Sequence, residues 1–256
     1  MLAGLYEGAL ADAQLREQKL SLVKLEHLAT SSRTPLSASE ALQRSGRVKV
    51  LAEIKRASPS KGILNAELQV GMQASKYESA GASAISVLTE QRGFHGSLQD
   101  LIEARESVAV PILRKDFIST EYQLLEARAF GADFALLIVA GLPNQRLVEL
   151  KNFAEQLELE VLVETHSEDE ARFAVDIGAR LIGVNARDLS TFETDRNLFA
   201  KVAHLIPDSS LRIAESAVRN ALDVRVYRDA GADVVLVGEA LVTGNPEDLI
   251  RDFISG

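Results

Sequence analysis

A junction that recurs four times restricts this chain to a small set of folds. Each copy has a helix-like segment, then Gly, Ala and a third residue, and then a short apolar run. Glycine is what a helix C-terminus needs for a left-handed residue, and the apolar run has the length of a buried strand. The repetition therefore predicts alternating helices and strands. The copies are "SAGASAISVL" from Ser79, "AFGADFALLIV" from Ala129, "DIGARLIGVN" from Asp176 and "DAGADVVLVG" from Asp229.

Weaker units complete a series of eight strands, which we expect at 48–54, 84–89, 109–114, 133–139, 160–164, 180–185, 211–214 and 233–237. Amphipathic segments between them predict helices at 66–79, 120–130, 143–157, 167–177 and 217–230. The spacing suits parallel βα units, and eight units in roughly 210 residues have the size of an α/β protein of the (β/α)8 TIM barrel class. A doubly wound open sheet is the alternative. It usually has fewer strands and often a Gly-x-Gly-x-x-Gly turn after the first one, and no such turn follows residue 54.

The residues before the first strand predict a separate helical segment. "LYEGALADAQLREQKLSLVKLEHLA" has helical spacing, and "SSRTPLSASEALQRSG" adds a link and a second capped helix. We expect residues 1–47 to be an N-terminal helical extension packed on a barrel of residues 48–256, the two forming one domain. A flexible arm is the alternative, but it would leave Leu5, Leu15, Leu22 and Leu25 in water.

Composition narrows the class of protein. The chain of 256 residues is 46% hydrophobic, has no cysteine and carries a net charge of −9. No apolar run among residues 1–30 is long enough for a signal peptide or a membrane span. These features predict a cytoplasmic protein with no membrane or nucleic-acid partner, while a local cluster of Lys and Arg can still attract an anionic small molecule.

The first strand ends in a way that a plain core strand does not. In "AEIKRASPSKG", Glu53 and Lys55 are two residues apart and therefore point to one face, while Ala52 and Ile54 point to the other. A lone charge at a strand end is usually solvated. The charges here belong to a larger pattern.

Four more predicted strands end in, or run directly into, an ionisable or amide residue, which shares its face with the residue two positions earlier. These residues are Lys115, Glu164, Asn185 and Glu215. Five strands that agree in parity and position favour a site at the C-terminal mouth of a barrel, where barrel enzymes work. Carboxylates and ammoniums packed closely shift one another's pKa values, as acid/base chemistry near neutral pH requires.

Phosphate sites in barrels tend to follow strands 7 and 8, on backbone N–H groups near a helix N-terminus. Here those segments are "ESAVRN" and "VGEALVTGNPEDL", which makes Ser216, Ala217, Gly238 and Glu239 candidates. Gly238 taken alone is equally a turn glycine. Ser58 after strand 1 can add a hydroxyl, although Ser-Pro also marks an ordinary turn.

No metal site is expected. The four histidines are scattered, without the spacing of a zinc motif. His166 lies just past Glu164 but is as easily a surface loop residue. We therefore expect an active site without metal.

Seven ordered motifs give the chain a resemblance to a known family. "LAEIKRASPSKG", "SVLTEQRGFHGS", "PILRKDFI", "VLVETHSEDE", "IGVNARDLSTF", "IAESAV" and "VLVGEALV" are similar to the motifs of indole-3-glycerol phosphate synthase of tryptophan biosynthesis. The resemblance covers nearly the whole chain and includes the N-terminal extension. It implies a lyase that closes 1-(2-carboxyphenylamino)-1-deoxyribulose 5-phosphate to a pyrrole ring with loss of CO₂ and water, and that uses no cofactor.

The resemblance also implies roles for the acid/base residues. Lys115 would be the general acid at the ribulose carbonyl, and Glu164 the general base of the dehydration. Lys55 would pair with the substrate carboxylate and serve in a later proton transfer, and Glu53 would orient the lysines. A lysine is a feasible acid near neutral pH if desolvation or neighbours lower its pKa from about 10.4. The residues leave open which lysine donates which proton.

Binding roles are implied for a second set. Asn185, Arg187, Glu215 and Ser216 would orient the substrate, Arg187 being a natural carboxylate partner because its fork matches two oxygens. Ser58 and the backbone at Ala217 and Gly238, with Glu239 beside it, would hold the phosphate. Phe94, Phe117 and Leu189 would line the anthranilate pocket. The chain departs from the family at Ala217, where many members have glycine, so a Cβ is added where the backbone approaches the phosphate.

Two other functions stay open. A phosphosugar isomerase or epimerase on the same scaffold would turn over a sugar phosphate without an aromatic group. A barrel that only binds a partner would show saturable binding without product, and it has no need of Glu53, Lys55, Lys115 and Glu164 together. For the enzyme we expect a small-molecule substrate and a monomer or weak homodimer.

Overall fold

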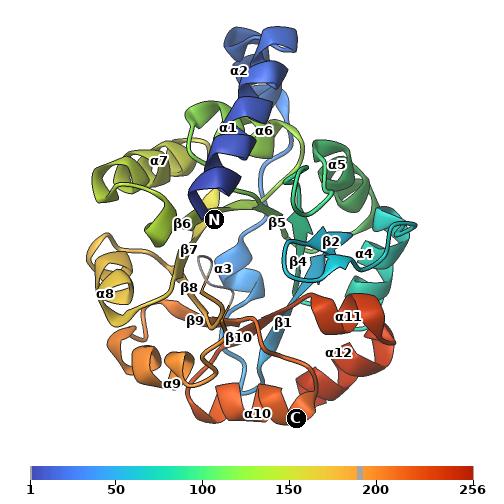
Figure 1. Ribbon diagram of the computed structural model, residues 1–256, viewed down its shortest axis with the longest axis vertical. Coiled ribbons are helices and arrows are strands. Elements are labelled where there is room, and N and C mark those ends of the chain that lie inside the picture. The colour runs from blue at the N-terminus through green and yellow to red at the C-terminus, as the bar shows by residue number, and fades with distance from the viewer. Residues whose placement is uncertain (1, 189–192, 256) are drawn as a thin grey trace.

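The computed structural model describes residues 2–188 and 193–255, and its centre is a closed barrel of eight parallel strands (Figure 1). The order around the barrel is β1-β10-β9-β8-β7-β6-β5-β4, so that the first and last strands pair and close the ring. The prediction of a (β/α)8 barrel is confirmed. The strands are β1 Lys49–Ile54, β4 Ala84–Leu88, β5 Ile112–Lys115, β6 Phe134–Ile138, β7 Glu160–Thr165, β8 Leu181–Asn185, β9 Leu211–Glu215 and β10 Val234–Val237.

Helices surround the strands, and most lie within a few residues of the expected segments (Figure 1). The last long helix before β10 starts at Ala221 rather than at 217, because the Asn220 side chain accepts from the backbone of Leu222 and Asp223 and caps it there. A small hairpin after β1, β2 Ala57–Ser58 with β3 Gly62–Ile63, was not predicted. The helices are α4 Val70–Ser79, α5 Leu98–Ser107, α6 Glu121–Ala129, α7 Asn144–Gln156, α8 Glu168–Asp176, α9 Leu198–Val202, α10 Ala221–Asp229, α11 Glu239–Thr243 and α12 Pro246–Ser255, with 3₁₀ turns η1 Val139–Gly141 and η2 Ala203–Leu205.

The four repeated junctions share one backbone geometry. Gly81, Gly131, Gly178 and Gly231 all have positive φ, between 70° and 106°. In each junction the alanine after the glycine donates its N–H to the carbonyl five residues earlier, as Ala132 does to Ala127 at 2.9 Å. This bond satisfies a carbonyl that the helix end leaves free and turns the chain into the next strand.

Alternate residues of the strands form two separate cores. Outward residues such as Val50 and Ile54 pack against the helices, whereas inward residues such as Leu51, Leu162 and Ile213 fill the barrel. The inward face is the one on which the strand-end charges were predicted to lie. The interior of the barrel is therefore apolar along most of its length and polar at the mouth formed by the C-terminal strand ends.

Three helices precede the barrel: α1 Leu2–Lys19, α2 Leu22–Ser31 and α3 Ala38–Ala41 (Figure 1). At the mouth, the Tyr6 ring of α1 meets the Phe117 ring edge-on, with ring centres 5.5 Å apart. At the opposite end, Ser39 of α3 donates its backbone N–H to Glu160 of β7 at 2.7 Å. The extension thus contacts both ends of the barrel, although Leu15 remains 54% exposed. In the described part of the chain, every helix is too short or too polar to cross a membrane.

Candidate active site

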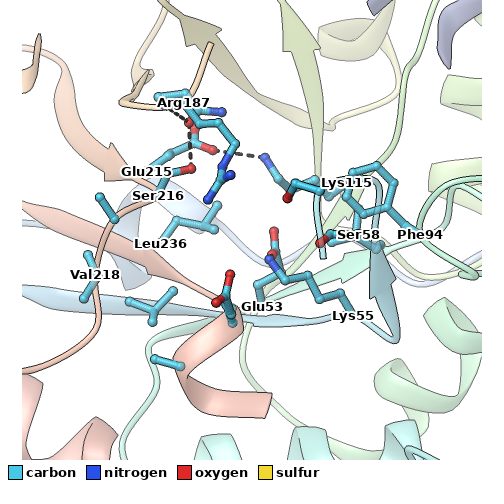
Figure 2. A pocket seen from close by; sticks show the side chains of 18 of the residues that line it. Glu53, Lys55, Ser58, Phe94, Lys115, Arg187, Glu215, Ser216, Val218 and Leu236 are labelled. Carbon is cyan, nitrogen blue, oxygen red and sulfur yellow. Dashed lines mark hydrogen bonds and ion pairs between the residues drawn. The ribbon is translucent and has the colours of Figure 1, made fainter. Parts of the chain in front are cut away.

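The strand ends surround one cavity of about 530 Å³ at the C-terminal mouth (Figure 2). Five strands contribute polar side chains to it, because each has an inward-facing polar residue at its C-terminal end or one position before it. All the site residues predicted from sequence line this cavity, except Leu189, which lies outside the described residues. They are Glu53, Lys55, Ser58, Phe94, Lys115, Phe117, Glu164, Asn185, Arg187, Glu215, Ser216, Ala217, Gly238 and Glu239.

Lys115 lies between two buried carboxylates. Its Nζ is 3.0 Å from Oε2 of Glu164 and 3.0 Å from Oε2 of Glu215. Burial alone would lower the pKa of Lys115, but these carboxylates, together with Glu53, raise it above its ordinary value. The shift is opposite to the one that would make a lysine a stronger acid. Lys115 is thus protonated at neutral pH, and it gives up its proton only where negative charge develops beside it.

The two carboxylates differ in their surroundings. Besides its contact with Lys115, Glu164 accepts a hydrogen bond at Oε1 from the side-chain amide of Asn185 at 3.0 Å. The same oxygen lies 3.2 Å from Nε2 of His166. Burial would raise the pKa of Glu164, but Lys115 and His166 hold it well below its usual range. Burial raises the pKa of Glu215 to about 8, Lys115 opposing the shift and Glu164 adding to it. Unequal environments of this kind separate a base from a neutral carboxylic acid at one pH.

The raised pKa of Glu215 predicts a pH-dependent stability. The folded chain keeps the Glu215 proton up to about pH 8, whereas the unfolded chain releases it near the ordinary glutamate pKa of 4.5. The unfolded state therefore binds fewer protons in this window, and the free energy of unfolding falls as pH rises, by at most about 1.4 kcal/mol per pH unit. Glu215→Gln should lack this fall in the free energy of unfolding. Denaturant titrations of both proteins from about pH 5 to about pH 8.5 should diverge, and parallel curves would contradict the assignment.

Glu53 and Lys55 form a second charged pair, with Oε1 and Nζ 2.8 Å apart. Gly238, at the end of β10, lies against this pair. A Cβ on Gly238 would be 2.3 Å from Oε1 of Glu53 and 3.0 Å from Nζ of Lys55. Gly238 is therefore more than a turn residue, because only the lack of a side chain leaves room for the pair.

Gly183 has the same relation to Glu215. It points inward from β8, and a Cβ there would lie 2.1 Å from Oε1 of Glu215. Gly183 was not among the residues predicted from the sequence, although its parity with Asn185 placed it on the inner face. Its missing side chain is what allows Glu215 to reach Lys115.

We expect Gly183→Ala to impair the site more than the fold. The methyl group would push the Glu215 carboxyl away from Lys115, and overpacking of this kind costs about 1–3 kcal/mol. Activity should fall by roughly tenfold or more, as such a free energy lost from the transition state implies. Gly4→Ala is a matched control, since a Cβ at Gly4 meets nothing within 4 Å. Steady-state rates and thermal unfolding of both variants would test this, and equal activity of the two would contradict it.

Asn185 connects Glu164 to the loop that follows β9. Its Oδ1 accepts from Ser216 Oγ at 2.8 Å and from the Arg187 N–H at 3.0 Å, while its amide donates to Glu164. In Figure 2 the Arg187 side chain extends into the cavity beside Ser216. Ser216 and Ala217 both have positive φ, 69° and 60°. Ala217, where the resemblance implies a glycine, thus lies in the left-handed region, at a cost of about 1–2 kcal/mol.

The loop after β10 presents backbone rather than charge to an anion. The Glu239 side chain points to Lys61, with Oε1 and Nζ 3.6 Å apart. A carboxylate does not bind phosphate, so only the backbone at Gly238 and Glu239 suits one here. Ser58, in β2, lines the cavity on the side of β1.

An apolar wall faces the charged groups. Phe94 and Phe117 have ring centres 6.2 Å apart. Leu136 and Ile138 of β6 add to this wall, whereas Leu236 of β10 lines the cavity beside Glu215; all three were missed from sequence. The alternation of inward and outward residues along β6 and β10 places these three residues inward, and it is the sequence signal by which they could have been found.

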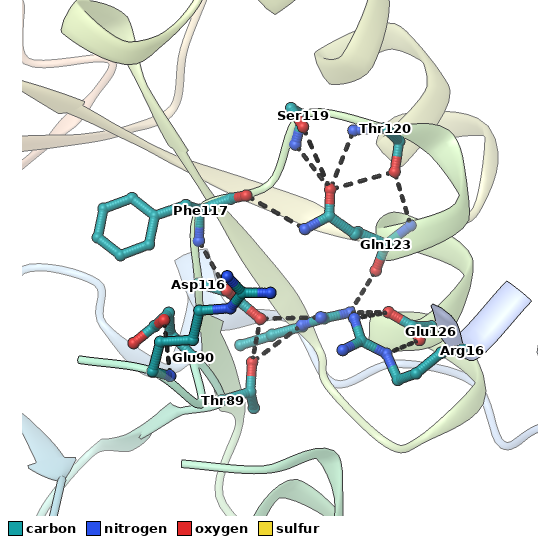
Figure 3. Close-up of polar contacts among 11 residues, drawn as sticks. Arg16, Thr89, Glu90, Asp116, Phe117, Ser119, Thr120, Gln123 and Glu126 are labelled. Atoms are coloured by element: carbon teal, nitrogen blue, oxygen red, sulfur yellow. Dashed lines mark hydrogen bonds and ion pairs between the residues drawn. The ribbon is translucent and has the colours of Figure 1, made fainter. Parts of the chain in front are cut away.

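A buried ionic network fixes the strand that carries Lys115 (Figure 3). Arg114 is fully buried; it contacts Asp116 at 2.9 Å and Glu126 of α6 at 3.2 Å. Asp116 accepts the Phe117 N–H at 2.8 Å, and Glu126 also pairs with Arg16 of α1 at 2.5 Å. The residues on both sides of Lys115 are thus held by helices of the barrel and of the extension.

The sequence left open whether His166 is a surface loop residue, and the structure shows that it is not. Its side chain is only 10% exposed and lies between Glu164 and Glu170. No three His, Asp or Glu side chains in residues 2–188 and 193–255 are arranged to hold a metal ion.

Comparison with known proteins identifies relatives over the full length. The family model for indole-3-glycerol phosphate synthase matches residues 2–253. The indole-3-glycerol phosphate synthase of Leifsonia xyli subsp. xyli is 53% identical over 253 residues, covering 99% of this chain and 97% of that protein. Those of a Parafrankia species and of Mycobacterium avium are 49% and 47% identical, covering 99% and 100% of this chain and 95% and 94% of theirs.

Solved structures with the same fold are more distant in sequence. Thiamine phosphate pyrophosphorylase from Pyrococcus furiosus has a TM-score of 0.61 at 15% identity, covering 80% of this chain and 93% of that one. The N-acetylmannosamine-6-phosphate 2-epimerase from Clostridium perfringens also has a TM-score of 0.61 at 15% identity, covering 88% and 99%. Likeness at this identity concerns the barrel alone, whereas the family match spans the chain and every motif at its mouth. The chain belongs to the indole-3-glycerol phosphate synthase family.

Proposed function

We propose that the chain converts 1-(2-carboxyphenylamino)-1-deoxyribulose 5-phosphate to indole-3-glycerol phosphate, with release of CO₂ and water, the ring-closing reaction of tryptophan biosynthesis. One observation carries the proposal beyond the family match. Lys115 touches both Glu164 and Glu215, and the Glu53–Lys55 pair lines the same cavity. A proton donor, a carboxylate base and a second lysine thus share one site.

The cavity suits a substrate with an anion at each end. Its volume of about 530 Å³ is within the range of small-molecule sites. We place the phosphate at Ser58 and the backbone of Ala217, Gly238 and Glu239. The carboxylate lies near Lys55 and Arg187, and the aromatic ring lies against the wall of Phe94, Phe117, Leu136 and Ile138. Anchors at both ends hold the two reacting carbons together.

Ring closure comes first in the reaction that we propose. The ring carbon that bears the carboxylate attacks the ribulose carbonyl, and Lys115 protonates the oxygen as negative charge develops on it. Attack breaks the aromaticity of the ring and leaves a cationic intermediate, which Glu53 stabilises. The bond to the carboxylate then breaks, CO₂ leaves, and its electron pair restores the ring.

Dehydration follows. Glu164, the ionised carboxylate, removes a proton from the carbon between the ring nitrogen and the new hydroxyl-bearing carbon. The hydroxyl leaves as water with a proton from Lys55, and the double bond of the pyrrole forms. Glu215, Asn185 and Ser216 orient the substrate through this step.

The test is a direct assay. Purified protein mixed with the carboxyphenylamino-deoxyribulose phosphate in buffer containing EDTA should produce growing indole fluorescence, at a rate that EDTA does not change. A ribulose phosphate without the aromatic group should not be turned over. If well-folded protein produced no increase in indole fluorescence, the proposal would be overturned. Sugar-phosphate isomerisation or binding without chemistry would then be the functions to test.

We further propose that the extension and the barrel form one domain, and that the protein acts as a monomer or weak homodimer in the cytoplasm. Contacts of α1 and α3 with the barrel support a single cooperative unit. The lack of cysteine fits a reducing compartment. One unfolding transition by calorimetry, with a mass near one chain by light scattering at micromolar concentration, is the expected result.

A further inference from the structure

His166 follows β7 and has a carboxylate at each ring nitrogen. Nε2 is 3.2 Å from Oε1 of Glu164, and Nδ1 is 3.5 Å from Oε2 of Glu170 in α8. Neither contact has the direction of a good hydrogen bond, so the attraction is chiefly between charges. The side chain is buried, which strengthens such an attraction.

This arrangement favours a charged ring. A neutral imidazole has one nitrogen without hydrogen, and its lone pair would face a carboxylate here. Only the imidazolium presents N–H to both sides. Burial would lower the pKa of His166, but Glu164 and Glu170 raise it to about 10. Glu164 and Glu170 are the titratable groups that face the ring, from β7 and α8, and Glu164 in turn faces Lys115 from β5.

Glu164 therefore has two cations, one for each oxygen. Lys115 lies at Oε2, and His166 lies at Oε1 together with the amide of Asn185. Of the two, only Lys115 lines the substrate cavity; His166 and Glu170 lie outside it. Glu164 is thus in contact with one cation that can donate its proton to the substrate, Lys115, and with a second that does not touch the substrate, His166.

We propose that His166, as an imidazolium, is a positioning residue that holds the Glu164 carboxylate in place and keeps it ionised after Lys115 has lost its proton. The inference rests on the proposed function. Once Lys115 is neutral, a buried Glu164 without another cation takes up a proton readily and is lost as the base for dehydration. His166 supplies the charge during that interval.

His166→Gln separates charge from position, because the amide of glutamine can occupy the place of Nε2 without carrying charge. We expect kcat to fall by about tenfold or more, the loss of one charged contact, with KM nearly unchanged. The acidic limb of the kcat profile should move to higher pH, because Glu164 then protonates more easily. His204→Gln, at an exposed histidine, is the matched control and should leave rate and profile unchanged.

Nitrogen NMR of histidine-labelled protein reads the charge directly. The chain has four histidines, so the signal lost in His166→Gln identifies this ring. Both its nitrogens should be protonated at about pH 8 in the wild type. Glu170→Gln keeps an acceptor for the backbone N–H of His166 and should lower the pH at which the ring titrates.

A neutral His166 ring at about pH 8 would overturn the inference, as would wild-type kcat with an unmoved profile in His166→Gln. A fall in kcat with an unmoved profile and a lower free energy of unfolding would also overturn it, by showing a purely structural role. Failure of the proposed function is distinguishable, because a wild type that forms no indole product still reports the ring charge by NMR.

Discussion

Replacing Lys115 with methionine is expected to lower kcat by roughly 10³–10⁴-fold, the upper range for loss of a general acid. Methionine has a similar length and leaves no cavity, so the fold should survive. Glu164 and Glu215 then lose the cation that they share, each within 3.0 Å of it. His166 still faces the other oxygen of Glu164, so this carboxylate stays ionised and the expected loss is that of the acid.

Indole fluorescence under saturating substrate measures this effect, with circular dichroism to confirm folding. Lys76→Met is the matched control, because Lys76 is an exposed residue of α4 and should give the wild-type rate. Activity of Lys115→Met within about tenfold of wild type would exclude Lys115 as the essential acid.

Glu164→Gln should produce the second large loss, about 10²–10⁴-fold in indole formation. The amide keeps the shape of the side chain but cannot accept the substrate proton. Ring closure and decarboxylation do not need that proton transfer. In a single turnover, CO₂ release should therefore persist while indole fluorescence fails to grow.

Glu160→Gln offers a control on the same strand and the same face. Glu160 lies at the opposite end of β7 and accepts from Ser39 of α3, so its loss should affect stability and spare kcat. Conserved rates in Glu164→Gln, or equal loss of CO₂ and indole in the first turnover, would contradict the role of Glu164 as the base of dehydration.

Much of the site was predictable from alternation along strands. Inward positions at or next to strand ends are occupied by Glu53, Lys115, Glu164, Asn185 and Glu215, and parallel strands bring their carboxyl ends to one mouth. The repeated glycine junctions predicted the barrel, because a positive φ at a helix end is a local requirement that sequence reveals.

Contacts between distant segments were not predictable in this way. The clash that a Cβ at Gly183 would make with Glu215 joins two strands, and it depends on the register of β8 against β9. His166 read equally well as a loop residue, because its burial comes from packing beyond β7. Sequence also gave no sign that α1 reaches the mouth while α3 reaches the other end, since helical periodicity predicts a buried face but not what covers it.

Closure of the ring sets the order in which the mouth can be completed during synthesis. Lys49 in β1 lies opposite Val234 in β10, the last strand of the ring, so the barrel remains open until β10 has been synthesised. Gly238, directly after β10, then comes to lie against the Glu53–Lys55 pair. A nascent chain can therefore carry most of the acids and bases of the site before it has a mouth in which they meet, and catalytic competence arrives only when β10 closes the ring.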